Sequence, residues 1–344
     1  MIRFECDYAE GAHERIIGAL VKTNFEQTPG YGEDVHCEEA RALIRKECKN
    51  EDLYVQFLVG GTQANLTVIA AALRPHEGAL CASTGHINVH ETGAVEATGH
   101  KVLPLPSEDG KITAEQIEEA YLLHINDSSF EHMVKPGLVY ISNPTECGTI
   151  YKKAELEAIY AVCQKYDLPL FLDGARLGYG LLSPENDMTM ADIAANTDVF
   201  YIGGTKVGLL MGEAVVIKNE MLKRDFRYFI KQKGAMLAKG RLLGVQFAEA
   251  FRDGLYYEMS ENAITLAEGI RNAFLKKGIA MRYDSPTNQL FPILTQEQCA
   301  VLGKDFAYSN IEALADGRKV VRFCTSWATK KEDAETLIRA IETL

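Results

Sequence analysis

The segment Asp198-Val199-Phe200-Tyr201-Ile202-Gly203-Gly204-Thr205-Lys206 joins a buried-strand pattern to a lysine that follows directly after a glycine turn. Its run of aromatic, Val and Ile residues is typical of a core strand. Partial burial lowers the pKa of a lysine and makes its amine a usable nucleophile, one that can form a Schiff base with an aldehyde. The alternative is a surface lysine that merely follows a strand, so the rest of the chain has to decide between the two.

Strand patterns recur on both sides of this segment and alternate with helical patterns. The predicted strands cover residues 53–59, 79–82, 101–105, 137–142, 169–173, 199–203 and 213–217. Helical patterns lie between many of them, at residues 63–73, 114–124 and 153–165. Strands that alternate with helices form a mostly parallel sheet that is covered on both faces. We therefore predict an α/β fold with a seven-stranded sheet, one strand of which ends at the lysine.

The chain after the sheet changes its pattern. A long helical region at 236–277 is broken near Asp253 and Gly254, and short strands follow at 280–283 and 290–293. A helix at 296–302, a strand at 320–324 and a helix at 331–344 complete the order, which is typical of a smaller α+β domain. We predict a large domain over residues 16–252 and a small C-terminal domain over 253–344, joined by the N-terminal segment 1–15.

Composition and charge restrict the class of protein. The chain has 344 residues, of which 47% are hydrophobic and 24% charged, as in soluble globular enzymes. The net charge of -12 argues against a broad basic surface for nucleic acid. Neither a signal-peptide pattern nor a membrane-length apolar run is present in the sequence, and the eight cysteines are scattered. We expect reduced thiols, a cytoplasmic location, and no nucleic-acid or membrane partner.

A glycine turn, Gly60-Gly61-Thr62, connects the first predicted strand of the sheet to a helix. Glycines let backbone N–H groups approach an anion, and a helix N-terminus adds free donors and a partial positive charge. The turn matches neither a Walker A loop nor a Gly-x-Gly-x-x-Gly fingerprint, so a single phosphate group fits it better than a nucleotide. The alternative is an ordinary tight turn with a threonine cap.

Asp173 closes another apolar strand, and Arg176 follows in the same turn. Ligands of open parallel sheets bind beyond the carboxyl ends of the strands, so we expect Asp173 on the same edge as Thr62 and Lys206. An ionised carboxylate there can keep a pyridine nitrogen protonated, as pyridoxal phosphate requires when it acts as an electron sink. A helix N-cap is the alternative role for Asp173.

His86 and His90 follow the predicted strand 79–82. The ring of His86 could stack on a planar cofactor or handle a proton. The spacing of the two histidines also suits zinc, but no third ligand and no His-Glu-x-x-His order is evident. We therefore expect no metal.

Arg322 lies inside the apolar strand 320–324 of the smaller domain. A guanidinium in such a place needs an anionic partner, and it could hold a substrate carboxylate through two parallel hydrogen bonds. The alternative is a structural ion pair.

Together and in this order, the motifs resemble the low-specificity L-threonine aldolases, which have the aspartate-aminotransferase-like fold of pyridoxal-phosphate enzymes. The similarity covers nearly the whole chain. It rests on Cys6-Asp7, Tyr31-Gly32-Glu33-Asp34, Gly61-Thr62-Gln63-Ala64-Asn65-Leu66, His86, Asp173-Gly174-Ala175-Arg176, Gly203-Gly204-Thr205-Lys206 and Val321-Arg322. The Asp-Gly-Ala-Arg motif with its downstream lysine is the most specific part.

The resemblance implies a role for each matching residue. Lys206 would carry pyridoxal 5'-phosphate as a Schiff base, and Asp173 would pair with the ring nitrogen. The remaining roles are phosphate binding by Gly61 and Thr62, ring stacking by His86, and a substrate-carboxylate clamp of Arg176 and Arg322. In the family the site lies between subunits of a tetramer, with the segment that begins at Tyr31 near the interface, and Lys231 is similar to a lysine that reaches the phosphate across it.

Two departures from the family pattern affect the substrate side of the site. Many members have a serine that touches the substrate carboxylate where this chain has Cys6, a poorer hydrogen-bond donor. Well-known members also carry a second active-site histidine, whereas this chain reads Asn143-Pro144-Thr145-Glu146-Cys147-Gly148 in that region. The base for the substrate hydroxyl is thus unassigned, and so is the preference between threo and allo substrates.

The resemblance implies a carbon–carbon lyase that cleaves L-threonine, L-allo-threonine or related β-hydroxy-α-amino acids, such as an aryl-serine, to glycine and an aldehyde. A β-eliminating lyase or an aminotransferase of the same fold is the alternative within the cofactor class. A non-catalytic pyridoxal-phosphate binder is the alternative outside it. We expect a homo-oligomer, either a tetramer or a dimer with shared sites, with small-molecule amino acids as its other partners.

Overall fold

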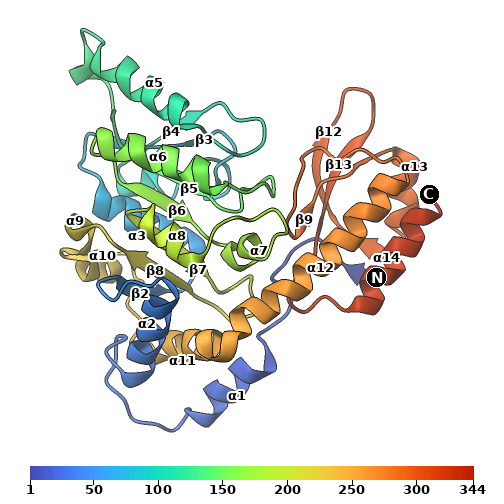
Figure 1. Ribbon diagram of the computed structural model, residues 1–344, viewed down its shortest axis with the longest axis horizontal. Helices are drawn as coiled ribbons and strands as arrows, with labels where there is room; N and C mark the ends of the chain where they lie inside the picture. Colours follow the sequence, from blue (N-terminus) through green and yellow to red (C-terminus); the bar gives the residue numbers. More distant parts are fainter.

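A seven-stranded sheet forms the centre of the computed structural model, which describes residues 1–344 (Figure 1). Its strand order is β2-β8-β7-β6-β5-β3-β4. The bounds are β2 Tyr54–Leu58, β3 Glu77–Ala82, β4 Lys101–Leu105, β5 Lys135–Ser142, β6 Leu170–Asp173, β7 Val199–Gly203 and β8 Glu213–Ile217. Only β8 runs against the others, because it pairs antiparallel with both β2 and β7 while the remaining pairs are parallel. The predicted seven-stranded, mostly parallel sheet is confirmed.

This topology brings the carboxyl ends of six strands to one edge of the sheet, which we call the rim. In the register, Ser142 of β5 stands beside Asp173 of β6, and Gly203 of β7 stands beside Glu213 of β8. Because β8 is reversed, its first residue rather than its last lies at the rim. The turn after β7, which ends in Lys206, therefore starts next to a buried glutamate.

Helices cover both faces of the sheet. Alternate residues of β5 belong to different cores: Val139 and Ile141 pack in a cluster of 44 buried residues, whereas Leu138 and Tyr140 pack in one of 21. The helices before the small domain are α1 Glu14–Lys22, α2 Val35–Glu47, α3 Gly61–Ala72, α4 His86–Val89, α5 Ala114–Ile125, α6 Lys153–Lys165, α7 Leu177–Leu181, α8 Met190–Ala195, α9 Glu220–Lys223, α10 Phe226–Gln232 and α11 Arg241–Phe251. Short 3₁₀ turns lie at Glu96–Thr98, Phe130–His132 and Arg252–Gly254.

The C-terminal part has its own core and small sheets. Helix α12, Leu255–Lys276, runs from the end of α11 to this part of the molecule, where both chain termini lie (Figure 1). Its other elements are β9 Gln289–Leu290, β10 Ile293–Leu294, α13 Gln296–Leu302, β11 Phe306–Ala307, β12 Ser309–Ala313, β13 Lys319–Cys324 and α14 Lys331–Glu342. The N-terminal strand β1, Ile2–Arg3, pairs with β11, and Phe4 packs in the core of this part.

The helix break near Asp253 has a backbone cause, because Asp253 has a positive φ of 58° between α11 and α12. The proposed division of the chain at residues 252 and 253 stays a prediction. One predicted strand, 280–283, is wrong: it contributes only an isolated bridge between Met281 and Pro292. The prediction also missed β12, whose residues are mostly exposed and lack the apolar alternation that reveals a strand.

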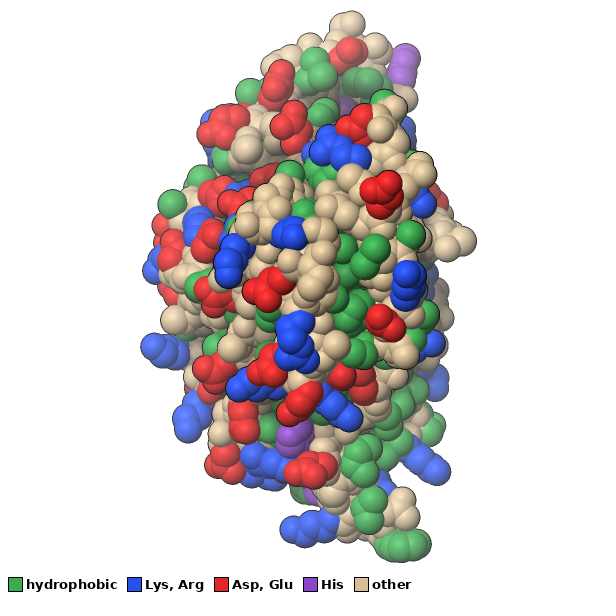
Figure 2. All heavy atoms as spheres, turned by 90° about the vertical axis from the view of Figure 1, so that its right-hand side faces the viewer, with side chains coloured by type: hydrophobic (Ala, Val, Ile, Leu, Met, Phe, Trp, Pro, Cys, Tyr) green, Lys and Arg blue, Asp and Glu red, His purple; other side chains and the backbone are tan.

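The surface of the small-domain side mixes both signs of charge. Figure 2 shows Lys and Arg side chains interspersed with Asp and Glu over this face. Hydrophobic side chains gather toward the lower end of the face, at the height where α1 lies in Figure 1. None of the helices combines the length and the apolar composition needed to cross a bilayer.

Candidate active site at the rim of the sheet

Two neighbouring cavities open at the rim. The Asp173 cavity, of about 340 Å³, is lined by residues that follow β2, β5, β6 and β7. The Arg322 cavity, of about 610 Å³, lies between the rim and residues of the small domain. Both are lined by Tyr8, His86, Glu146, Arg176 and Lys206. Lys206 therefore lies where a group bound in one cavity meets a group bound in the other.

Lys206 is not the surface lysine of the alternative interpretation. Burial lowers its pKa, the positive charge of Arg176 lowers it further, and the carboxylates of Asp7 and Asp173 only partly oppose the shift. The turn that carries it is held by Glu213, which accepts hydrogen bonds from Gly204 N at 3.1 Å and Thr205 Oγ1 at 3.0 Å. A partly buried amine with a lowered pKa on a fixed turn has the properties of a nucleophile.

Asp173 lines the Asp173 cavity, and its carboxylate accepts several hydrogen bonds. The hydroxyls of Tyr140 and Tyr201 donate to its carboxylate, as do Asn65 Nδ2 at 3.1 Å and Ala175 N at 3.0 Å. Burial would raise the pKa of Asp173, but the charge of His86 and the tyrosine hydrogen bonds outweigh burial and lower it. The carboxylate is therefore held in its ionised form inside the protein.

The N-terminal turn of α3 supplies free backbone N–H groups at the wall of this cavity. Its N-cap, Gly60, is in an extended conformation and provides no side-chain hydrogen bond, so the first N–H groups of α3 have no capping side chain. Gly61 and Thr62 line the cavity. A Cβ at position 61 would lie 3.0 Å from the Tyr201 hydroxyl, which explains a glycine at this point. The threonine cap of the alternative interpretation is not formed.

His86 takes part in a buried polar chain. Its Nδ1 lies 2.7 Å from Glu91 Oε1, and Asn65 Nδ2 donates both to that oxygen at 2.7 Å and to Asp173. Burial would lower the pKa of His86, but the hydrogen bond with Glu91 and the charge of Asp173 outweigh it and raise the pKa. The rings of His86 and His90 are 5.6 Å apart, and no group of three or more potential metal ligands is present in the structure.

The two predicted clamp arginines differ in their surroundings. Arg176 donates from Nε and Nη2 to Asp7 at 2.6 and 3.0 Å, so one edge of its guanidinium is already paired. Arg322 forms no salt bridge: it donates to Gln289 Oε1 at 3.3 Å and to the carbonyl oxygen of Glu5 at 3.1 Å, and its buried Nε has no partner. Arg322 thus presents an uncompensated charge to the Arg322 cavity.

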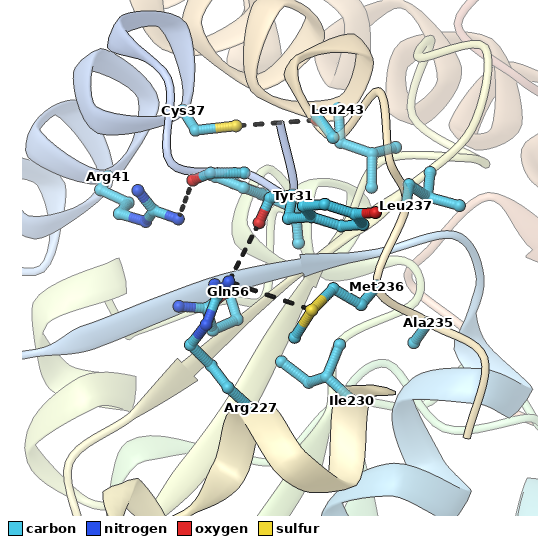
Figure 3. Close-up of a pocket in the computed structure, with 13 residues that line it drawn as sticks. Tyr31, Cys37, Arg41, Gln56, Arg227, Ile230, Ala235, Met236, Leu237 and Leu243 are labelled. Carbon is cyan, nitrogen blue, oxygen red and sulfur yellow. Dashed lines mark hydrogen bonds between the residues drawn. The ribbon is translucent and has the colours of Figure 1, made fainter. Parts of the chain in front are cut away.

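Three predicted site residues do not line either cavity: Cys6, Tyr31 and Lys231. Cys6 is partly buried, and its neighbours Asp7 and Tyr8 reach the site instead. Lys231 Nζ lies 5.1 Å from the ring centroid of Tyr31. Tyr31 lines a separate pocket with Arg227, which donates to the Tyr31 carbonyl oxygen at 3.3 Å (Figure 3). Within one chain, the structure therefore separates this pair from Lys206.

Sequence reasoning missed several residues that complete the rim. They are Asp7, Tyr8, Asn65, Glu91, Tyr140, Glu146, Tyr201 and Glu213. Asn65 stands inside a motif that already pointed to the site, and Glu91 directly follows His90, so their polarity in buried segments was a usable signal. Tyr140 and Tyr201 offered none, because an aromatic residue in a core strand is the expected pattern.

The fold itself defines a broad class of enzyme. An aspartate aminotransferase of Thermus thermophilus matches with a TM-score of 0.71 over 100% of this chain and 91% of its own, at only 14% identity. The chain therefore has the aspartate-aminotransferase-like fold, a class of enzymes that work with pyridoxal phosphate.

More specific similarity comes from sequence. Residues 13–296 match the β-eliminating lyase family. A threonine aldolase of Leishmania major is 46% identical, with a TM-score of 0.97 over 100% of this chain and 99% of its own. A low-specificity L-threonine aldolase of Pseudomonas sp. (strain NCIMB 10558) is 28% identical and covers 98% of this chain and 97% of the relative. The chain belongs to the β-eliminating lyase family, and within it to the threonine aldolases.

Proposed function

We propose that the chain is a pyridoxal-phosphate-dependent aldolase that cleaves L-threonine or L-allo-threonine to glycine and acetaldehyde. The observation that carries this proposal is the Asp173 cavity. One space of about 340 Å³ is bordered by a partly buried lysine with a lowered pKa, an ionised carboxylate and an uncapped helix N-terminus. The threonine aldolase relatives, which match over nearly the full chain, support the same activity.

The residues present fit pyridoxal phosphate. Lys206 would bind its aldehyde carbon, Asp173 its ring nitrogen, and the N–H groups of Gly61 and Thr62 its phosphate, since all four residues line the same cavity. When bound, the cofactor supplies an electron sink for the bond that breaks at Cα of the substrate. Because Asp173 is held ionised, it favours the protonated ring nitrogen that this sink requires.

The side chains of the Arg322 cavity are suited to an amino-acid substrate. Arg322 lines this cavity without an acidic partner and can bind the α-carboxylate with a charge-assisted hydrogen bond. His86, with its pKa raised, can hold a proton between the two cavities. Fixing the carboxylate restricts rotation about Cα, and that rotation decides which bond is aligned for cleavage.

The alternatives differ from aldol cleavage in their products. A β-eliminating lyase would release ammonia and a keto acid, and an aminotransferase would require an amino acceptor. A cofactor-storage protein would have no use for an unpaired arginine facing a second cavity. The curated relatives that match over nearly the full length are threonine aldolases, which favours cleavage to glycine.

We propose further that the protein is a homo-oligomer with shared sites, located in the cytoplasm. Tyr31 and Lys231 contact each other away from the cavities of their own chain, which suits a role at a neighbour's site. Helix α1 and the turn after it expose large apolar side chains: Val21 is 69% and Phe25 94% exposed. Such side chains are typical of a subunit contact.

The first prediction concerns the products. Purified protein with pyridoxal phosphate should convert L-threonine to equal amounts of glycine and acetaldehyde, because the Cα–Cβ bond is the one that breaks. Borohydride reduction should fix the cofactor to the peptide that contains Lys206, as seen by mass spectrometry. Lys206→Ala should abolish both results. Release of ammonia and a keto acid instead of glycine would show β-elimination and contradict the proposed cleavage. Labelling of a different lysine would show that Lys206 does not carry the cofactor.

The second prediction concerns Arg322→Lys, which keeps the charge but loses the planar fork. Loss of a charge-assisted contact worth about 1.5–3 kcal/mol should weaken threonine binding about ten- to hundred-fold, and turnover should fall as well. Melting temperature and cofactor absorbance should stay unchanged. Arg318→Lys, the same change in an exposed salt bridge with Asp316, is the control and should behave like the wild type. A large fall in melting temperature, with normal threonine kinetics in the protein that remains folded, would show that Arg322 has a structural role.

The third prediction tests the shared sites. Light scattering at assay concentration should show a dimer or a larger species. Lys206→Ala and Lys231→Ala chains, each impaired alone, should recover activity when they are co-expressed, because a hybrid contains one site with both lysines. Hybrids that form but stay inactive, or a fully active monomer, would contradict this arrangement.

A further inference from the structure

Cleavage of a β-hydroxy amino acid needs a group that accepts the hydroxyl proton, and no residue has that role so far. This inference rests on the proposed aldolase function. The acceptor has to face the Arg322 cavity, where the substrate would lie. Among the residues that line that cavity, Glu146 is the one carboxylate. Glu146 also lines the Asp173 cavity, so it lies at the junction of the two spaces, together with Lys206.

The carboxylate of Glu146 is anchored at one oxygen and unpartnered at the other. Oε1 accepts hydrogen bonds from Ser142 Oγ at 2.7 Å and from the backbone N–H of His86 at 3.0 Å. Oε2 is buried and has no hydrogen-bond partner. An unsatisfied carboxylate oxygen in a protein interior is costly, and a hydroxyl that donates to it relieves that cost. The anchoring also fixes the side chain, as a proton acceptor requires.

The groups around Glu146 and His86 favour a proton acceptor at Glu146 and a proton donor at His86. Burial raises the pKa of Glu146, the Ser142 hydrogen bond opposes this, and the charge of Asp173 adds to the rise. A raised pKa makes a carboxylate a stronger base. The pKa of His86 is also raised, which favours its charged form, a proton donor rather than an acceptor. Other titratable or charged groups around Glu146 include Tyr8, Cys81, His90, Glu91, Tyr140, Cys147, Tyr151, Arg176, Lys206, Tyr283 and Arg322.

We propose that Glu146 is the general base of the aldol cleavage and takes the proton of the substrate β-hydroxyl through Oε2. The O–H bond breaks and its proton passes to Glu146, while the O–H electron pair forms the carbonyl of the departing aldehyde. The Cα–Cβ bond breaks and its electron pair stays with Cα. Water supplies the proton that adds to Cα to give glycine, and Glu146 returns its own proton to water, so no net proton is gained or lost.

The test compares Glu146→Gln with the wild-type holoenzyme in two reactions. Glutamine keeps the shape and can still accept from Ser142 and His86, but it cannot take a proton. Threonine cleavage should fall about 100-fold or more, the usual loss when a general base is removed. Exchange of the glycine α-hydrogen with deuterated water, which involves no β-hydroxyl, should stay close to the wild-type rate. The wild-type turnover should decline as the pH falls through the pKa of Glu146, and the residual turnover of the variant should lack this decline.

A second readout does not depend on the cofactor. In the cofactor-free chain, infrared difference spectra between acid and alkaline pH should contain a buried carboxylic acid that is missing from Glu146→Gln. Glu77→Gln is the matched control, since Glu77 is a buried glutamate at the start of β3, at the opposite end from the rim. This variant should keep the infrared signal, the cleavage and the exchange.

The outcomes separate this inference from the function on which it rests. If the wild type does not cleave threonine or allo-threonine, the aldolase function fails, and the base with it. If the wild type cleaves and Glu146→Gln cleaves equally well, only the base assignment fails. A parallel loss of cleavage and of exchange would show that Glu146 serves binding or structure, and would overturn its role as the base.

Discussion

The site depends on keeping the Asp173 carboxylate charged inside the protein. Burial alone would raise the pKa of Asp173 and favour the neutral acid. The charge of His86 and several hydrogen bonds lower this pKa instead. The donors of these hydrogen bonds are Tyr140, Tyr201, Asn65 and the backbone of Ala175. Those donors come from β5, β7, α3 and the turn after β6. The fold thus contributes donors from several of the elements that line the cavity, and the charge in turn ties these elements together.

Close backbone packing places the carboxylate and the lysine in one site. A Cβ at Gly174 would lie 2.0 Å from the carbonyl oxygen of Tyr201, and one at Gly203 would lie 2.3 Å from that of Ala175. The turns after β6 and β7 therefore pack backbone against backbone, which only glycine permits at these two positions. Asp173 precedes one turn and Lys206 ends the other, so their separation is set by the main chain and not by flexible side chains.

The sequence predicted the strands of the sheet and their order along the chain better than the contacts between buried polar side chains. Strands such as β7 could be located because each is an apolar run that ends in glycine or a charged residue. The rim positions of Thr62, Asp173 and Lys206 then followed from the parallel topology. Partners across the sheet could not be derived this way. Glu213 reaches the lysine turn only because β8 is reversed, and Arg176 contacts Asp7, which lies 169 positions earlier in the sequence. Pairings of this kind are decided by the tertiary fold and leave no local pattern.

The ionised state of Asp173 can be measured directly through the nitrogen of the cofactor ring. Pyridoxal phosphate labelled with ¹⁵N at that nitrogen would be bound to the wild type and to Asp173→Asn, and the two would be compared by NMR at neutral and at alkaline pH. A buried, charged carboxylate predicts a protonated ring nitrogen in the wild type at both pH values and an unprotonated one in the variant. An unprotonated nitrogen in the wild type, or identical shifts in the two proteins, would contradict the role assigned to Asp173.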